Sequence, residues 1–167
     1  MEDLLLSIDR KDYVKTGKHC RRIAVRGIIK KENKYAMIHS EKYGEYKFPG
    51  GGMKEGETKE DTLKREVREE TGLVVKEESI KYIGRAEEIR KGLYDAVFEM
   101  TSYYYQCDVE DKLVPRELDD YEREYGYELE FVTLDEAIKN NKNIKETRNI
   151  PWIDRDTMIM EKMNNKE

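Results

Sequence analysis

Residues 51–73, which read GGMKEGETKEDTLKREVREETGL, carry the strongest pattern in the chain. Thr58 is a good helix N-cap, and an acidic residue three positions later approximates a capping box. Leu63 and Val67 lie four positions apart, as apolar residues do on the buried face of a helix, and Gly72 is a typical stop signal. The stretch therefore predicts a glycine-rich loop followed by a helix that ends at Gly72.

Three carboxylates share one face of this predicted helix. Glu66, Glu69 and Glu70 stand at positions i, i+3 and i+4. Like charges at this spacing cost about 0.2–0.5 kcal/mol per pair, and acidic residues in the last turn oppose the helix dipole. Because Arg65 and Arg68 relieve part of the repulsion, a solvated charged face is one interpretation. The other is a site for a hard divalent cation, which prefers carboxylate oxygens and removes the repulsion.

The loop before the helix favours the second interpretation. Residues 49–52 read PGGG, so proline and three glycines exclude regular structure and let the backbone come close to a ligand. A cation that bridges carboxylates and a diphosphate neutralises developing charge and positions a water for attack at phosphorus. The hypothesis from the residues alone is metal-assisted hydrolysis of a phosphoanhydride.

The same residues resemble a known family signature. Every specified position of the Nudix box is matched. The matching residues are Gly51, then after five residues Glu57, after seven more Arg65-Glu66-Val67, after one more Glu69-Glu70, and after one more Gly72-Leu73. The resemblance implies the Nudix fold, an α/β (α+β) arrangement with a mixed β-sheet between α-helices. It also implies a hydrolase that cleaves the pyrophosphate bond of a nucleoside diphosphate linked to another moiety.

The resemblance further implies a metal site. Glu66, Glu69 and Glu70 would bind Mg²⁺ or Mn²⁺ and supply the catalytic carboxylates, and Gly50 could add its carbonyl oxygen. One carboxylate would activate the attacking water, and Glu66 is our preference for this base.

Other positions of the signature have supporting roles in this interpretation. In some family members a fourth carboxylate comes from the loop before the last strand, where Glu124 and Glu122 are the candidates here. Glu57 and Arg65 would form an ion pair that orients the loop and the helix. Gly51 and Gly72 would be needed for backbone conformation.

The rest of the chain indicates one domain, residues 1–167, with a C-terminal helical tail at about 152–164. Residues 22–30 and 34–39 predict a hairpin, and 115–127 predicts an acidic loop with some helix. The further strands are expected at 80–90, 94–109 and 128–132, and the further helices at 133–140 and 154–163. Trp152, Ile159, Met160 and Met163 would dock the last helix on the body; a homodimer contact is the alternative use of this stripe.

Composition excludes several function classes. The 32 basic and 37 acidic residues leave a net charge of −5, which argues against a protein that binds long nucleic acids. No apolar run approaches the roughly 20 residues that a membrane helix requires. Cys20 and Cys107 match no metal-binding spacing and suggest a reduced, cytoplasmic protein. His19 and His39 are isolated, as structural histidines usually are.

The substrate lies outside the signature. The family's ADP-ribose-type members often carry a proline in the region corresponding to 88–90, and its dinucleoside-polyphosphate members a tyrosine near 89–91; this chain has neither. A modified nucleoside triphosphate or a nucleotide sugar stays open. The tyrosines that could stack on a base are Tyr35, Tyr43, Tyr46 and Tyr94.

A competing function class is a non-catalytic Nudix module that senses a nucleotide or binds a protein. The usual sequence sign of such a module is the loss of signature carboxylates, and none is lost here. The sequence therefore favours the hydrolase.

Overall fold

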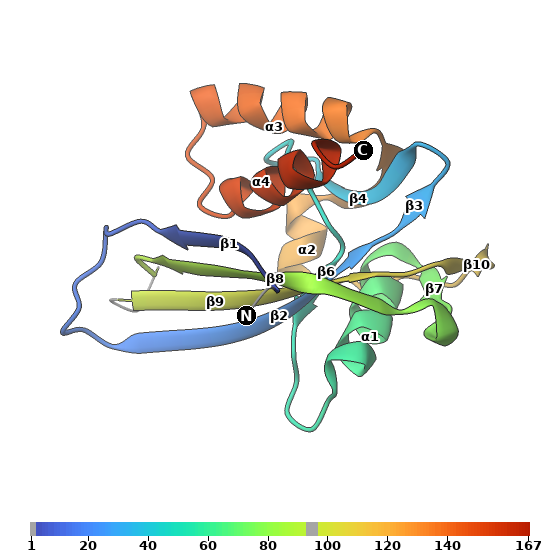
Figure 1. Ribbon diagram of the computed structural model, residues 1–167, viewed down its shortest axis with the longest axis horizontal. Coiled ribbons are helices and arrows are strands. Elements are labelled where there is room, and N and C mark those ends of the chain that lie inside the picture. Colours follow the sequence, from blue (N-terminus) through green and yellow to red (C-terminus); the bar gives the residue numbers. More distant parts are fainter. Residues whose placement is uncertain (1–2, 93–96) are drawn as a thin grey trace.

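The computed structural model describes residues 3–92 and 97–167, which form two main β-sheets and four α-helices (Figure 1). Helices α3 and α4 lie on one side of the sheets and α1 on the other. The expected mixed sheet between helices is therefore confirmed. No helix among the described residues is both long and apolar enough to cross a membrane.

The larger sheet has the strand order β1-β8-β9-β2-β6. Its strands are β1 (Leu4–Asp9), β2 (His19–Ile28), β6 (Gly50–Gly52), β8 (Lys81–Arg90) and β9 (Val97–Gln106). The pairs β1/β8 and β2/β9 are parallel, whereas β8/β9 and β2/β6 are antiparallel. Because β6 is the glycine-rich segment, the sheet holds the loop of the sequence signature directly against β2.

A second sheet has the order β11-β4-β3, with β5 beside β4. Its strands are β3 (Lys30–Lys31), β4 (Lys34–Ser40), β5 (Tyr46–Lys47) and β11 (Tyr127–Val132). The predicted hairpin of 22–30 with 34–39 is confirmed only at its tip, where Lys30 pairs with Tyr35. The remainder of its first arm belongs to the larger sheet because β2 finds longer partners there, β9 above all.

Helix α1 (Lys59–Thr71) follows the prediction closely. Thr58 caps it in a full capping box, and Gly72 ends it with a φ of 77°, which glycine adopts without steric cost. Leu63 and Val67 are fully buried against Val25 and Ile29. Burial of each such side chain contributes about 1.5–3 kcal/mol, so the apolar face fixes the rotation of the helix and with it the directions in which Glu66, Glu69 and Glu70 point.

Other elements differ from the predictions in extent. The strand expected at 94–109 ends at Gln106, and β10 (Val109–Leu113) then pairs with β7 (Leu73–Val75). Helix α3 (Leu134–Thr147) is longer than expected, because the residues after Asn140 continue to pack on α4 (Ile153–Asn164). A short helix α2 (Asp120–Tyr125) lies within the acidic segment, and a single 3₁₀ turn (Glu77–Ser79) precedes β8.

The stripe on α4 packs inside the protein. Ile159 and Met160 are buried in a core cluster with Met37 and Ala137, and Met163 packs at its margin. These side chains dock α4 on the body, so they are not free to form a dimer contact.

Candidate active site

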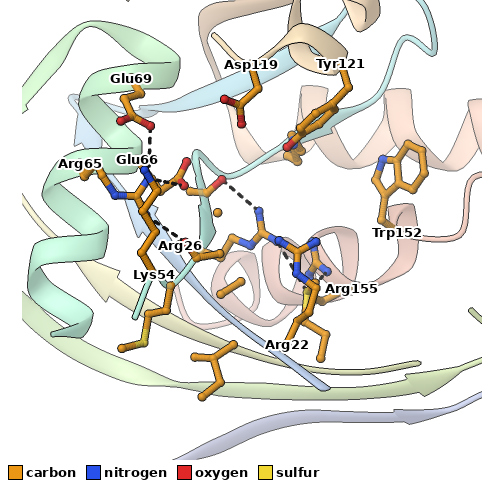
Figure 2. A pocket seen from close by; sticks show the side chains of 18 of the residues that line it. Arg22, Arg26, Lys54, Arg65, Glu66, Glu69, Asp119, Tyr121, Trp152 and Arg155 are labelled. Carbon is orange, nitrogen blue, oxygen red and sulfur yellow. Dashed lines mark hydrogen bonds and ion pairs between the residues drawn. The ribbon is translucent and has the colours of Figure 1, made fainter. Parts of the chain in front are cut away.

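A pocket of about 620 Å³ opens beside the carboxylate face of α1 (Figure 2). Its walls come from α1, β2, β6, α2 and the start of α4, which the fold brings together from distant parts of the sequence. Carboxylates line one side, guanidinium groups lie at the bottom, and aromatic rings line the remaining side. Such a pocket can hold a ligand that combines negative charge with a flat ring.

Glu66 and Glu69 project from α1 into this pocket (Figure 2). Nη1 of Arg65 donates to Oε1 of Glu66 at 2.8 Å and to Oε2 of Glu69 at 3.2 Å. Burial raises the pKa of Glu66, and the neighbouring arginine offsets part of that rise. The two carboxylates therefore lie at the surface of the pocket, where a ligand can reach them.

Glu70 lies deeper and is only 1% exposed. Its Oε2 accepts a hydrogen bond from the Gly50 amide at 3.2 Å. Burial raises its pKa well above the ordinary value; a hydrogen bond with the Glu122 carboxyl adds to the rise, and the nearby charge of Lys47 opposes it. Two buried carboxyl groups in contact need either a shared proton or a cation between them.

Of the two late-loop candidates, the structure brings Glu122 to the group and leaves Glu124 outside. Glu122 is 3% exposed, and its Oε1 accepts a hydrogen bond from the Asp119 amide at 2.8 Å. The Glu124 side chain is 67% exposed and pairs with Lys42 at 3.1 Å. They are two positions apart and so lie on roughly opposite faces of α2, and the buried face of this short helix decides which acid points inward.

The donor set suits a hard divalent cation. Carboxylate oxygens are the ligands that Mg²⁺ and Mn²⁺ prefer, and the contact between Glu70 and Glu122 is one that a cation would relieve. Within the described ranges no three acidic, histidine or cysteine side chains are grouped tightly enough to hold a metal as they stand. At Glu66 and Glu69 the reason is Arg65, which already donates a hydrogen bond to each of these two carboxylates.

Arg65 is also the partner of Glu57. Its Nε and Nη2 donate to the two Glu57 oxygens at 2.6 and 2.9 Å, and Nη2 also donates to the Gly52 carbonyl at 3.0 Å. The guanidinium lowers the pKa of Glu57 to about 2, assisted by the Lys54 amide. This pair joins the glycine-rich segment to α1 and so fixes the distance between the backbone loop and the carboxylates.

The glycines of the signature are needed for different reasons. A Cβ on Gly50 would lie 2.0 Å from the Val25 carbonyl oxygen, so the contact between β6 and β2 excludes any side chain. Gly51 has no unusual φ, but a Cβ there would lie 2.6 Å from the Glu66 carboxylate. At Gly51 the requirement is therefore space for Glu66, whereas Gly72 needs its left-handed conformation.

The aromatic residues of the pocket differ from those that the sequence suggested. Tyr35 is buried, Tyr46 stacks on His39, Tyr43 contacts Trp152 from outside the lining, and Tyr94 lies outside the described residues. The rings that line the pocket are Phe98, Tyr121, Tyr125, Tyr127 and Trp152. The close spacing of three tyrosines around α2 was a signal that could have indicated this wall.

Comparison with known proteins gives consistent matches. A family model described as the NUDIX domain matches residues 20–154. An ADP-ribose pyrophosphatase of Methanocaldococcus jannaschii is 43% identical over 61 residues, which are 35% of this chain and 36% of that protein. The match thus spans about a third of the length of this relative.

Solved structures share the fold at low sequence identity. A NUDIX hydrolase from Nitrosomonas europaea aligns with a TM-score of 0.61 at 18% identity, covering 89% of this chain and 92% of the other. A MutT protein from Bacillus halodurans aligns with a TM-score of 0.57 at 20% identity, covering 81% and 84%. These likenesses concern the fold, and the site residues rest on the geometry above.

Proposed function

The chain belongs to the NUDIX domain family, and from this premise we propose that it is a metal-dependent hydrolase of nucleoside diphosphates linked to another moiety. The bond cleaved is the pyrophosphate bond. The observation that carries the proposal is the burial of the Glu70 and Glu122 carboxyl groups, Glu70 bonded to the glycine-rich segment, beside a pocket lined by Glu66 and Glu69. A purely structural acidic face would leave these carboxylates in solvent.

In this proposal Glu66, Glu69 and Glu70 hold Mg²⁺ or Mn²⁺, and Glu122 supports them from α2. When bound, the cation neutralises charge on the phosphate oxygens and so assists attack at phosphorus. Gly50 adds its carbonyl oxygen as a further ligand. Arg65 keeps the helix and the loop in register through Glu57.

Glu66 remains our choice for the group that removes a proton from the attacking water. It lies at the pocket surface, and its pKa is raised by burial, which brings a carboxylate closer to the range useful for general base catalysis. Glu69 and Glu70 then serve as ligands without a proton-transfer role.

The substrate is a small nucleotide held against the aromatic wall. Tyr121 and Trp152 project toward the pocket (Figure 2), and such rings stack readily on a base. The relative named as an ADP-ribose pyrophosphatase makes ADP-ribose one substrate to test, together with modified nucleoside triphosphates and nucleotide sugars. We also propose that residues 1–167 act as one cytoplasmic domain.

The proposal is tested by a mass-spectrometric turnover screen with Mg²⁺ and with Mn²⁺. The panel contains oxidised and normal nucleoside triphosphates, ADP-ribose, nucleotide sugars and dinucleoside polyphosphates, with Glu69→Gln as the blank. We expect cleavage that needs both the metal and Glu69, and the product masses identify the broken bond. A folded protein that binds metal but cleaves none of these compounds would instead indicate a nucleotide sensor.

A matched pair of variants tests the late-loop ligand. Glu122→Gln should lower turnover far more than Glu124→Gln, since only Glu122 is buried against Glu70. Equal effects of the two substitutions would contradict this assignment.

A further inference from the structure

Three guanidinium groups converge at the bottom of the pocket, away from the carboxylates of α1 (Figure 2). Arg22 and Arg26 come from β2, four positions apart and therefore on the same face of the strand. Arg155 comes from α4, which is far away in sequence. We call Arg22, Arg26 and Arg155 the arginine floor.

Two members of the arginine floor are buried, and Arg26 has only poor acceptors. Arg26 is 6% exposed; its Nη1 reaches the Gly50 carbonyl only at 3.4 Å, its Nη2 the Met100 sulfur at 3.8 Å, and its buried Nε has no partner. Arg155 is 3% exposed, and its Nη1 also donates to the Met100 sulfur, at 3.2 Å. A thioether sulfur is a weak acceptor, so it does not satisfy two guanidinium groups.

The neighbouring acids only partly neutralise the arginine floor, because the single carboxylate of Asp156 faces both Arg155 and Arg26. Asp156 pairs with Arg155 at 3.2 Å, but it also accepts hydrogen bonds from the Tyr104 hydroxyl and the Phe48 amide. Glu88 is paired with Arg90. Neither Arg22 nor Arg26 forms an ion pair in the part of the chain that the structure describes. Buried positive charge that is only partly balanced is unfavourable, and an anionic ligand would relieve it.

Gly50 separates the arginine floor from the carboxylates. Its amide faces Glu70, whereas its carbonyl oxygen faces Arg26. The two sites are therefore adjacent, because one residue contacts both. A ligand with several phosphates can thus reach both sites.

We infer that Arg22, Arg26 and Arg155 form a subsite for a third phosphate group of the ligand, beyond the diphosphate that is cleaved beside α1. The forked guanidinium donors match phosphate oxygens and bind them in pairs. Ligands with three consecutive phosphates therefore bind better than those in which a diphosphate is joined to a neutral sugar. The choice among substrates rests on the proposed function, but phosphate binding by the arginine floor does not.

The binding test uses inorganic tripolyphosphate without any metal, measured by calorimetry. Arg26→Met should weaken binding about tenfold or more, as expected for loss of hydrogen bonds to a charged group. The matched control is Arg21→Met, because Arg21 also lines the pocket but its side chain is 79% exposed and already paired with Glu99. Wild-type affinity in Arg26→Met, or an equal loss in Arg21→Met, would overturn the inference.

Two further measurements separate this role from a structural one. The melting temperature of Arg26→Met should equal or exceed that of the wild type, because the substitution removes an unpaired buried charge. Arg22→Met, at an exposed position where folding is not at risk, should also weaken tripolyphosphate binding. Unchanged binding in Arg22→Met together with a strongly lowered melting temperature of Arg26→Met would identify Arg26 as structural and end the proposal.

Kinetics then distinguish this inference from the proposed function. Arg26→Met should raise KM for a nucleoside triphosphate about tenfold and leave KM for ADP-ribose within about twofold. An equal rise for both substrates would refute the subsite although the enzyme is active. A wild-type protein that binds tripolyphosphate through Arg26 but hydrolyses nothing would refute only the proposed function.

Discussion

Gly51→Ala should separate activity from stability. The added Cβ would lie 2.6 Å from the Glu66 carboxylate, whereas ordinary contact begins at 3.4 Å, so the carboxylate must move by roughly 0.8 Å. Misplacement of a reacting group by about 1 Å costs about 100-fold in rate, which corresponds to about 2.7 kcal/mol of transition-state stabilisation. Since Gly51 has no left-handed φ, the backbone itself accepts alanine without strain.

The assay compares kcat, KM and melting temperature of Gly51→Ala with those of Gly52→Ala. A Cβ on Gly52 would meet only the end of the Arg22 side chain, at 2.7 Å, which is exposed and can swing aside. We expect kcat to fall about 100-fold in Gly51→Ala. In Gly52→Ala we expect kcat to stay within about threefold of the wild-type value and KM to change instead. A Gly51→Ala protein with wild-type kcat would refute the argument that this glycine makes room for Glu66.

Three other outcomes follow from the carboxylates. Glu69→Gln and Glu70→Gln should each lower turnover by about 100-fold or more, because each removes a proposed metal ligand. The fold should persist, because each substitution also removes one of several acids that repel one another. Wild-type activity in both variants would refute the metal site. Since the pKa values of Glu66 and Glu70 are raised, the rate should increase with pH as they ionise, and a maximum below about pH 6 would contradict this. The pKa of Glu57 is lowered from 4.5 to about 2 by Arg65, so the stability it contributes is present above pH 4.5 and lost toward pH 2. The difference in melting temperature between wild type and Glu57→Gln should therefore shrink over that interval.

Local signals were sufficient for α1. Its cap, its apolar pair and its terminal glycine are all encoded within one short segment, so the sequence predicted the helix bounds and the shared face of Glu66, Glu69 and Glu70. The family followed from the same segment because the spacing of the signature is specific. The sequence also predicted the long strands β8 and β9, although β9 ends at Gln106 and not at residue 109 as predicted.

The sequence did not predict the strand pairings that join distant parts of the chain. The edge strand β1 was missed because its partner β8 lies far along the chain, and nothing local in LLLSID distinguishes an edge strand from a loop. The hairpin of β2 with β4 was overestimated because β2 pairs with β9 instead. A strand pairs with the partner that offers more hydrogen bonds and more burial. A short stretch of sequence does not contain this information.

The sequence by itself determined the signature segment: the helix, the glycine-rich loop before it and the carboxylates that they present. Only the tertiary structure decided which acid of α2 faces Glu70, which rings line the pocket and that Arg155 joins Arg26 at its bottom. The physical reason is that the first set is fixed by contacts within one helical turn or one capping box. The second set is fixed by how separate elements pack, and their charges meet only once α2, α4 and β2 are in place.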